Sequence, residues 1–117
     1  MISHNTENGS VNVSTNVYVD IAGTAASNCF GVKGMAARSR TDGLIYLLRK
    51  ESANKGVSVT FHDDDTITID LHIMVDHGVN IPVVSSSIIN EVSYIVTKST
   101  GTAVKAVKVH VDSIMVD

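Results

Sequence analysis

The sequence predicts an α+β fold: a two-layer sandwich in which a mixed β-sheet carries two main helices on one face. Two strand–helix–strand units, at about 9–37 and 67–112, suit parallel strands, because a parallel crossover needs a dozen or more residues. A central hairpin between these units adds antiparallel strands. The strands alternate apolar and polar residues, which predicts that the other face of the sheet is open to water.

The first unit begins with a short strand at 11–13, and Ser14 or Thr15 can cap the helix that follows. The apolar residues of this helix recur at helical spacing on one face. They are Val17, Ile21, Ala22, Ala25 and Cys29. Gly31 ends the helix, because glycine tolerates a positive φ, and a strand over 32–37 completes the unit.

The middle of the chain predicts a brief helix and then a hairpin. Asp42 can cap a helix over 44–51. Residues 57–61 alternate between apolar and polar side chains, as a strand exposed on one face does. The polar run 63–65 is typical of a hairpin turn, and it leads into a second alternating strand at 67–75.

The second unit contains the long helix. Asn80 can serve as its N-cap, and Pro82 lies in the first turn, where a missing N–H has little effect. Gly101 closes the helix. Its main apolar stripe consists of Ile81, Val84, Ile88, Val92 and Ile95.

The last strand changes parity at both ends. Val107, Val109 and Val111 alternate with polar residues and are expected to face the core. Val104 and Ile114 fall on the opposite parity. This change predicts a β-bulge or an edge contact near each end of the strand.

Length and composition fit one domain, which we expect over residues 9–117, after a disordered tail at 1–8. Of the 117 residues, 44% are hydrophobic and 4% are aromatic, so the core consists mainly of small aliphatic side chains. The net charge of −3 does not suit a polyanion binder. The single cysteine, Cys29, excludes an internal disulfide and a cysteine-based zinc site, and it indicates a reducing compartment. Neither a signal peptide nor a membrane-spanning apolar run is found, so we expect a cytoplasmic protein without transmembrane insertion.

Seven short motifs run in order along nearly the whole chain. They are Gly9-Ser-Val-Asn-Val13, Gly31-Val-Lys-Gly-Met35, Asp42-Gly-Leu44 with Leu47-Leu48, Lys55-Gly-Val-Ser-Val59, Ile69-Asp-Leu-His-Ile73, Gly78 with Ile81-Pro82, and Gly101 before Val104 and Val107-Lys-Val-His-Val111. In this order they resemble the alkaline-shock protein family, the envelope-stress proteins of Gram-positive bacteria, and in particular its short, single-domain members.

This resemblance implies a cytoplasmic, non-enzymatic protein of cell-envelope homeostasis. It implies self-association into a homo-oligomer and a membrane-anchor protein as a partner, which would hold the chain at the inner face of the cell membrane. It implies neither catalytic residues nor a cofactor.

Basic residues are concentrated in the middle third of the chain. One hypothesis is a surface for phosphate, anionic lipid or an acidic partner, such as the acidic hairpin of a second copy. The alternative is ordinary solvated charge. The segment 44–48 is apolar all round a predicted helix, so it either packs within the fold or docks onto a partner or membrane. The expected partner-binding residues are Arg38, Arg40, Leu44, Leu47, Leu48, Arg49 and Lys50.

The residues Gly31-Val32-Lys33-Gly34 form a GxxG sequence, as in the loop by which KH domains hold a nucleic-acid backbone. In KH domains that loop joins two helices, whereas here a strand is expected to follow. Termination of the helix is therefore the better explanation. A KH-like module for single-stranded nucleic acid stays the alternative function, and nucleic acid is not the expected partner.

Histidine and aspartate residues gather on the polar face of the predicted strand at 67–75. His72 lies between Asp70 and Asp76, and His110 and His62 belong to faces that could adjoin it. Such a set could hold a metal ion or respond to pH. No His-x-x-x-His pair or cysteine partner supports a metal site, and exposed histidines on a solvated sheet are commoner. We therefore expect no metal.

Overall fold

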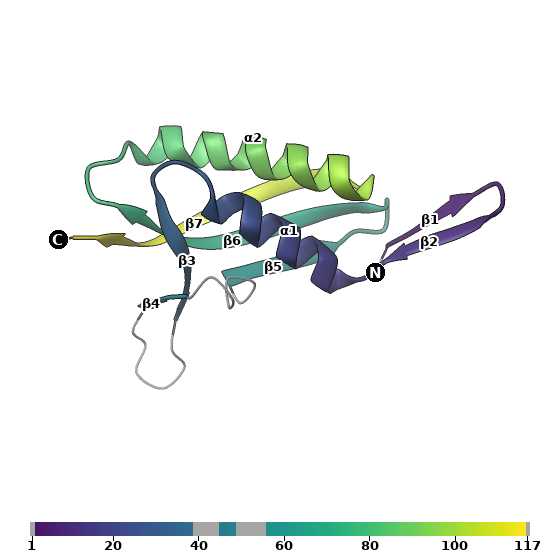
Figure 1. Ribbon diagram of the computed structural model, residues 1–117, viewed down its shortest axis with the longest axis horizontal. Helices are drawn as coiled ribbons and strands as arrows, with labels where there is room; N and C mark the ends of the chain where they lie inside the picture. The colour runs from purple at the N-terminus through teal and green to yellow at the C-terminus, as the bar shows by residue number, and fades with distance from the viewer. Residues whose placement is uncertain (1, 39–44, 49–55, 117) are drawn as a thin grey trace.

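The computed structural model describes residues 2–38, 45–48 and 56–116, which form a sheet, two helices on one side of it and a separate β-hairpin (Figure 1). The elements in chain order are β1 (Ile2–Thr6), β2 (Gly9–Val13), α1 (Thr15–Ser27), β3 (Val32–Arg38), β4 (Ile45–Leu47), β5 (Val57–Phe61), β6 (Thr66–Asp76), α2 (Ile81–Thr100) and β7 (Ala103–Met115). Neither of the two described helices is long and apolar enough to cross a membrane.

Strand β6 lies at the centre of the sheet. β7 runs parallel along one side of it, while β3 and β5 pair antiparallel, end to end, along the other. β4 extends the sheet beyond β3. The predicted mixed sheet in an α+β sandwich is therefore confirmed, and so is the parallel crossover from β6 through α2 to β7.

The core lies between the sheet and the two helices. Every second residue of β6 points to the helices, and all five of these side chains are fully buried: Ile67, Ile69, Leu71, Ile73 and Val75. α2 covers them with Val84, Ile88 and Val92 of its predicted stripe and with Val96, whereas Ile95 of that stripe is only half-buried. α1 buries Tyr18, Ala22, Ala25 and Ala26 instead, so its buried face includes Tyr18, while Val17 is exposed.

The predicted signals at the ends of α2 are confirmed, whereas those of α1 are not: Ser14 is its N-cap residue but makes no side-chain capping hydrogen bond, and the helix ends at Ser27, before Gly31. The Asn80 side chain accepts a hydrogen bond from the backbone N–H of Val83, and Gly101 ends α2 with a φ of +74°. The register between β6 and β7 shifts twice, which leaves Lys105 and Asp112 as extra residues in β7. These two β-bulges lie where the change of parity in the sequence predicted them.

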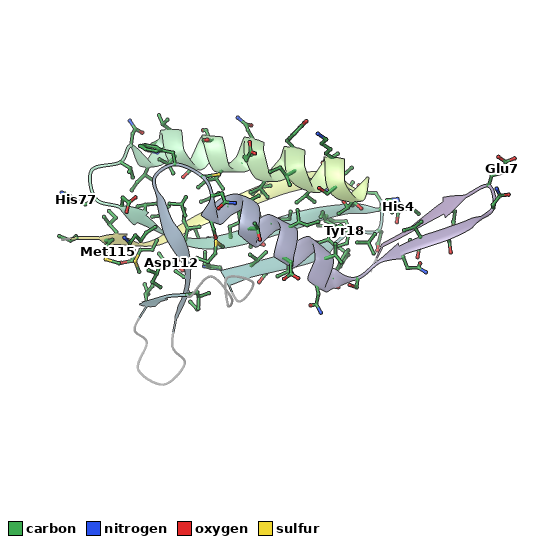
Figure 2. The ribbon with its side chains drawn as sticks, viewed as in Figure 1. His4, Glu7, Tyr18, His77, Asp112 and Met115 are labelled. Carbon is green, nitrogen blue, oxygen red and sulfur yellow. The ribbon has the colours of Figure 1, made fainter. Side chains whose placement is uncertain are left out.

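The first predicted unit does not form a parallel pair, and this expectation was wrong. β2 pairs with β1 in a separate hairpin instead of joining the sheet beside β3, and β1 occupies residues where a disordered tail was expected. Figure 2 shows Glu7 at the tip of this hairpin, far from the helices. The apolar face of β2 is short: Val13 packs against the core, but Val11 is exposed, so the strand buries little apolar surface.

A short hydrogen-bonded chain connects the hairpin to the domain. The buried hydroxyl of Tyr18 lies 2.7 Å from Thr102 Oγ1, which lies 3.1 Å from His4 Nε2. Figure 2 shows His4 and Tyr18 at the same end of the domain, where the hairpin begins. The chain gives each buried hydroxyl a partner, as burial of a polar group requires.

The predicted helix over 44–51 is also wrong for its described part. Ile45–Leu47 forms β4, which pairs antiparallel with the end of β3. Leu48 follows, and its backbone N–H donates to the carbonyl oxygen of Met35. A short segment that is apolar on all sides suits a strand as well as a buried helix, and pairing with β3 decides between the two.

Candidate functional site

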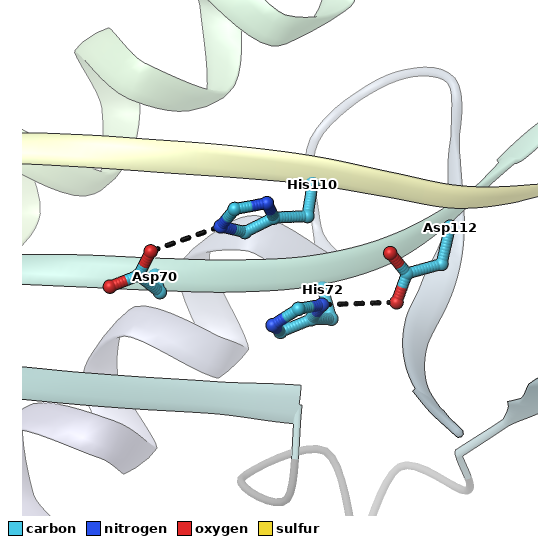
Figure 3. Close-up of polar contacts among 4 residues, drawn as sticks. All are labelled: Asp70, His72, His110 and Asp112. Atoms are coloured by element: carbon cyan, nitrogen blue, oxygen red, sulfur yellow. Dashed lines mark hydrogen bonds and ion pairs between the residues drawn. The ribbon is translucent and has the colours of Figure 1, made fainter.

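The face of the sheet away from the helices carries a cluster of two histidines and two aspartates (Figure 3). His72 Nδ1 lies 3.0 Å from Asp112 Oδ2, and His110 Nε2 lies 3.0 Å from Asp70 Oδ1. We call these four residues the His–Asp cluster. All four side chains are partly exposed to solvent.

The position of the cluster follows from the register of the parallel strands. His72 of β6 and His110 of β7 are direct partners, and their rings stack 4.6 Å apart at 14°. Asp112 is the extra residue of the second bulge, which places its carboxylate beside His72. Alternation in the sequence predicted these residues to be on the polar face, but the stacked pair depends on the register.

Each carboxylate orients one imidazole ring. Because a carboxylate oxygen only accepts, neutral His72 carries its proton on Nδ1 and neutral His110 on Nε2. Among the described residues, no hydroxyl or thiol is hydrogen-bonded to either ring. Within residues 2–38, 45–48 and 56–116, the cluster therefore has no nucleophile that would complete a Ser–His–Asp arrangement.

The other residues of the hypothetical metal site lie elsewhere. His62 Nε2 is 2.7 Å from the hydroxyl of Thr68, and Asp76 is exposed at the end of β6. Within the described ranges, no group of three or more His, Cys, Asp or Glu side chains is arranged to hold a metal ion. The cluster therefore stands as two neighbouring His–Asp hydrogen bonds on an open face.

The expected partner-binding residues are only partly described. Arg40, Leu44, Arg49 and Lys50 lie outside the described residues, and Arg38 is the last residue of β3. The two described leucines differ. Leu47 is 38% exposed, whereas Leu48 is half-buried and packs against the core.

The GxxG sequence connects a helix to a strand, as expected. α1 ends at Ser27, and Val32 to Gly34 already belong to β3. Gly31 has a φ of +87°, and a Cβ atom there would lie 2.9 Å from Val84 Cγ2. Its backbone conformation and its closeness to α2 both explain the glycine, without a phosphate contact.

An exposed aromatic residue at the turn before β3 was not identified from the sequence. Phe30 is 90% exposed, and Val83 in the first turn of α2 is 64% exposed. A hollow of about 480 Å³ lies beside them, lined also by Val79 and His77. We call Phe30, Val79 and Val83 the Phe30 patch. Figure 2 shows His77 at the opposite end of the molecule from Glu7, so the patch lies away from the hairpin.

The position of Phe30 in the sequence contains a signal that could have found it. Phe30 follows the last turn of α1 and directly precedes Gly31, outside the helical spacing of the apolar stripe. Segments that connect two elements usually run over the surface, so an aromatic side chain at such a position is a candidate for exposure. The backbone N–H of Asp76 donates to the Gly31 carbonyl oxygen, which fixes the turn.

The single cysteine lies at the end of α1. Its thiol donates to the carbonyl oxygen of Ala25 at 3.3 Å and is half-buried. Burial raises the pKa of Cys29 above its ordinary value, and the negative charge of Glu91 adds to this effect. The thiol is therefore a poor nucleophile at neutral pH.

Comparison with known proteins gives one family and several relatives. The sequence model of the alkaline shock protein 23 family, described as having a cell envelope-related function, matches residues 3–116. The uncharacterized protein YloU of Bacillus subtilis is 36% identical over 95% of this chain and 92% of its own length. The uncharacterized protein Spy1614 of Streptococcus pyogenes is 35% identical over 96% and 93%, respectively. No solved structure matches the chain.

Proposed function

The chain belongs to the alkaline shock protein 23 family, whose function relates to the cell envelope, and we propose that it acts there as a non-catalytic scaffold in envelope-stress homeostasis. In this proposal the protein is cytoplasmic, associates with itself, and binds a membrane-associated partner. Membership of the family confirms the resemblance that the ordered motifs indicated.

The Phe30 patch is the observation that carries the proposed self-association. An aromatic side chain that is 90% exposed beside an apolar hollow leaves both the ring and the hollow in contact with water. In a two-fold dimer the same patch contacts itself, so each Phe30 ring can enter the hollow of the other copy. Exposed Asp76 and His77 line the same hollow and can pair reciprocally across such an interface.

The proposed contact with the membrane-associated partner combines the apolar segment 44–48 with the basic residues on either side of it. Leu47 provides exposed apolar surface in the described part of this segment. Basic side chains next to apolar ones suit an anionic lipid surface or an acidic partner. Arg38, Arg40, Arg49 and Lys50 supply the positive charge in this proposal.

Crosslinking in the native cell tests the scaffold directly. We expect a membrane protein to be recovered with the wild-type chain, and its yield to fall when the four basic residues are replaced by glutamine. A control variant with Lys105 and Lys108, on β7, replaced by glutamine should retain it. Recovery of the same membrane protein by both variants in equal amounts contradicts the proposed contact. Salt-dependent retention of RNA by the purified protein would instead favour the KH-like alternative.

A further inference from the structure

A groove runs between the two helices on the outer side of the molecule. It consists of two connected hollows of about 380 and 260 Å³, which share Ala25, Asn28 and Ile95. Its apolar floor comes from both helices, with Ile21 and Ala25 from α1 and Ile95 from α2. We call these three residues the groove floor. The groove is separate from the Phe30 patch, because the two share no lining residue.

The charged side chains that line the groove are all acidic. Asp20 borders one hollow and Glu91 the other, and in the described part of the chain no lysine, arginine or histidine lines either hollow. α2 also carries Lys98, but this residue does not line the groove. Its Nζ lies 5.5 Å from the centre of the Tyr94 ring. The groove therefore combines an apolar floor with negative charge at two places along its length.

We propose that this groove binds a basic amphipathic helix of the membrane-associated partner, an inference that rests on the proposed function for the existence of that partner. The apolar face of the helix would cover the groove floor, and its lysine or arginine side chains would lie beside Asp20 and Glu91. Charge complementarity selects this occupant over an acidic or neutral helix. Segments that flank membrane spans on the cytoplasmic side are rich in lysine and arginine, so the partner is of a kind that carries such a helix.

The single cysteine provides a built-in reporter for this groove. Cys29 lines the second hollow together with Glu91, and no other residue of the chain carries a thiol. A helix seated in the groove covers this hollow. Its binding should therefore slow the reaction of Cys29 with a soluble maleimide, whereas binding elsewhere leaves the rate unchanged.

The test uses the full chain and a synthetic helical peptide about as long as α2, with leucine on one face and lysine on the other. We expect the peptide to bind in a salt-dependent manner and to slow maleimide labelling of Cys29 by about fivefold or more at saturation. A peptide with glutamate in place of lysine should do neither. Absence of binding by the lysine peptide, or binding without protection of Cys29, overturns the proposal.

Charge variants identify the groove as the binding site. Asp20→Asn and Glu91→Gln should each weaken binding of the lysine peptide about three- to tenfold. Asp63→Asn removes the same charge from the exposed hairpin turn and should leave affinity unchanged. Equal losses in all three variants would show attraction to net charge alone and would overturn the assignment.

Failure of this inference differs from failure of the proposed function. If the groove is wrong, the peptide does not protect Cys29, while crosslinking in the cell still recovers a membrane protein. If the proposed partner is wrong, crosslinking recovers none, whatever the peptide does. The size of the purified protein reports on the Phe30 patch and is independent of both results.

Discussion

At the scale of single residues, three hydrogen-bonded side chains connect the β1–β2 hairpin to the core. Tyr18 and Thr102 are both almost completely buried, and each hydroxyl depends on the other, while His4 forms the outer end of the chain. A buried polar group without a hydrogen-bond partner is unfavourable. These hydrogen bonds therefore stabilise the fold mainly by giving both buried hydroxyls a partner.

Thr102→Val tests this chain, because valine keeps the shape of threonine but has no hydroxyl. The substitution leaves the Tyr18 hydroxyl buried without its partner, and we expect the free energy of unfolding to fall by about 1–3 kcal/mol. Urea denaturation measures the change. Thr97→Val, at an exposed position of α2, is the control. An equal loss of stability in both variants would contradict the role of the Tyr18–Thr102–His4 hydrogen bonds.

Alanine substitutions at two glycines with positive φ distinguish the effect of backbone strain from the effect of steric crowding. Gly101→Ala should lower the free energy of unfolding by about 1–2 kcal/mol, since the nearest atom to a new Cβ, in His4, is 3.8 Å away. Gly31→Ala should lower it by roughly 1–3 kcal/mol more, because its Cβ would lie 2.9 Å from Val84 Cγ2. Thermal or urea unfolding of both variants measures the difference. Equal losses would mean that Val84 moves freely out of the way.

The raised pKa of Cys29 predicts how stability changes with alkaline pH. The folded protein favours the neutral thiol more than the unfolded chain does, mainly because of burial and further because of Glu91. This contribution is fully present below the pKa of the unfolded thiol and is lost as pH rises through the folded value. We expect the difference in stability between the wild type and Cys29→Ala to shrink between pH 8 and 10. A constant difference over this range would contradict the shift.

At the scale of elements, the second half of the fold could be predicted because its signals are local. α2 has a helical stripe, an N-cap at Asn80 and a left-handed residue at Gly101, and all three act within a few residues. The parity change in β7 even indicated its bulges. β4 was missed because its apolar pattern fits a helix as well as a strand, and only pairing with β3 decides between them. The β1–β2 hairpin pairs neighbouring residues, from Thr6 with Gly9 to Ile2 with Val13, and it was missed because the polar residues before Gly9 were interpreted as a tail.

The His–Asp cluster shows the same limit for the candidate site. Its residue types and their position on the polar face followed from alternation along each strand. Its geometry did not, because the pairing of His72 with His110 depends on a parallel register, and the Asp112 contact depends on a bulge. The Phe30 patch and the groove were missed for a related reason: each combines residues from elements far apart in the sequence.

Removal of residues 1–8 tests the hairpin as a separate element. β1 pairs only with β2, and among its described side chains only His4 is hydrogen-bonded to the domain. We expect the shortened chain to fold cooperatively, with a loss of stability close to that of His4→Ala. Differential scanning calorimetry of the two variants makes the comparison. A much larger loss would show that β1 is part of the domain's core.

At the scale of the whole molecule, the surfaces proposed for a second copy and for the helix of the membrane-associated partner are separate. The Phe30 patch lies beside His77, at the opposite end of the molecule from Glu7 (Figure 2), and the acidic groove lies between α1 and α2. A protein with separate surfaces can contact a second copy and a partner at the same time, as a scaffold must. Each surface can therefore be altered without the others.

Sedimentation velocity over a range of protein concentrations tests the proposed self-association most directly. We predict that the wild type sediments faster as concentration rises, and that Phe30→Ser weakens association about tenfold or more, since burial of a phenylalanine side chain drives it. Tyr94→Ser, at another exposed aromatic residue, should sediment like the wild type. A wild type that stays monomeric throughout, or a Phe30→Ser variant that associates as strongly as the wild type, would contradict the account.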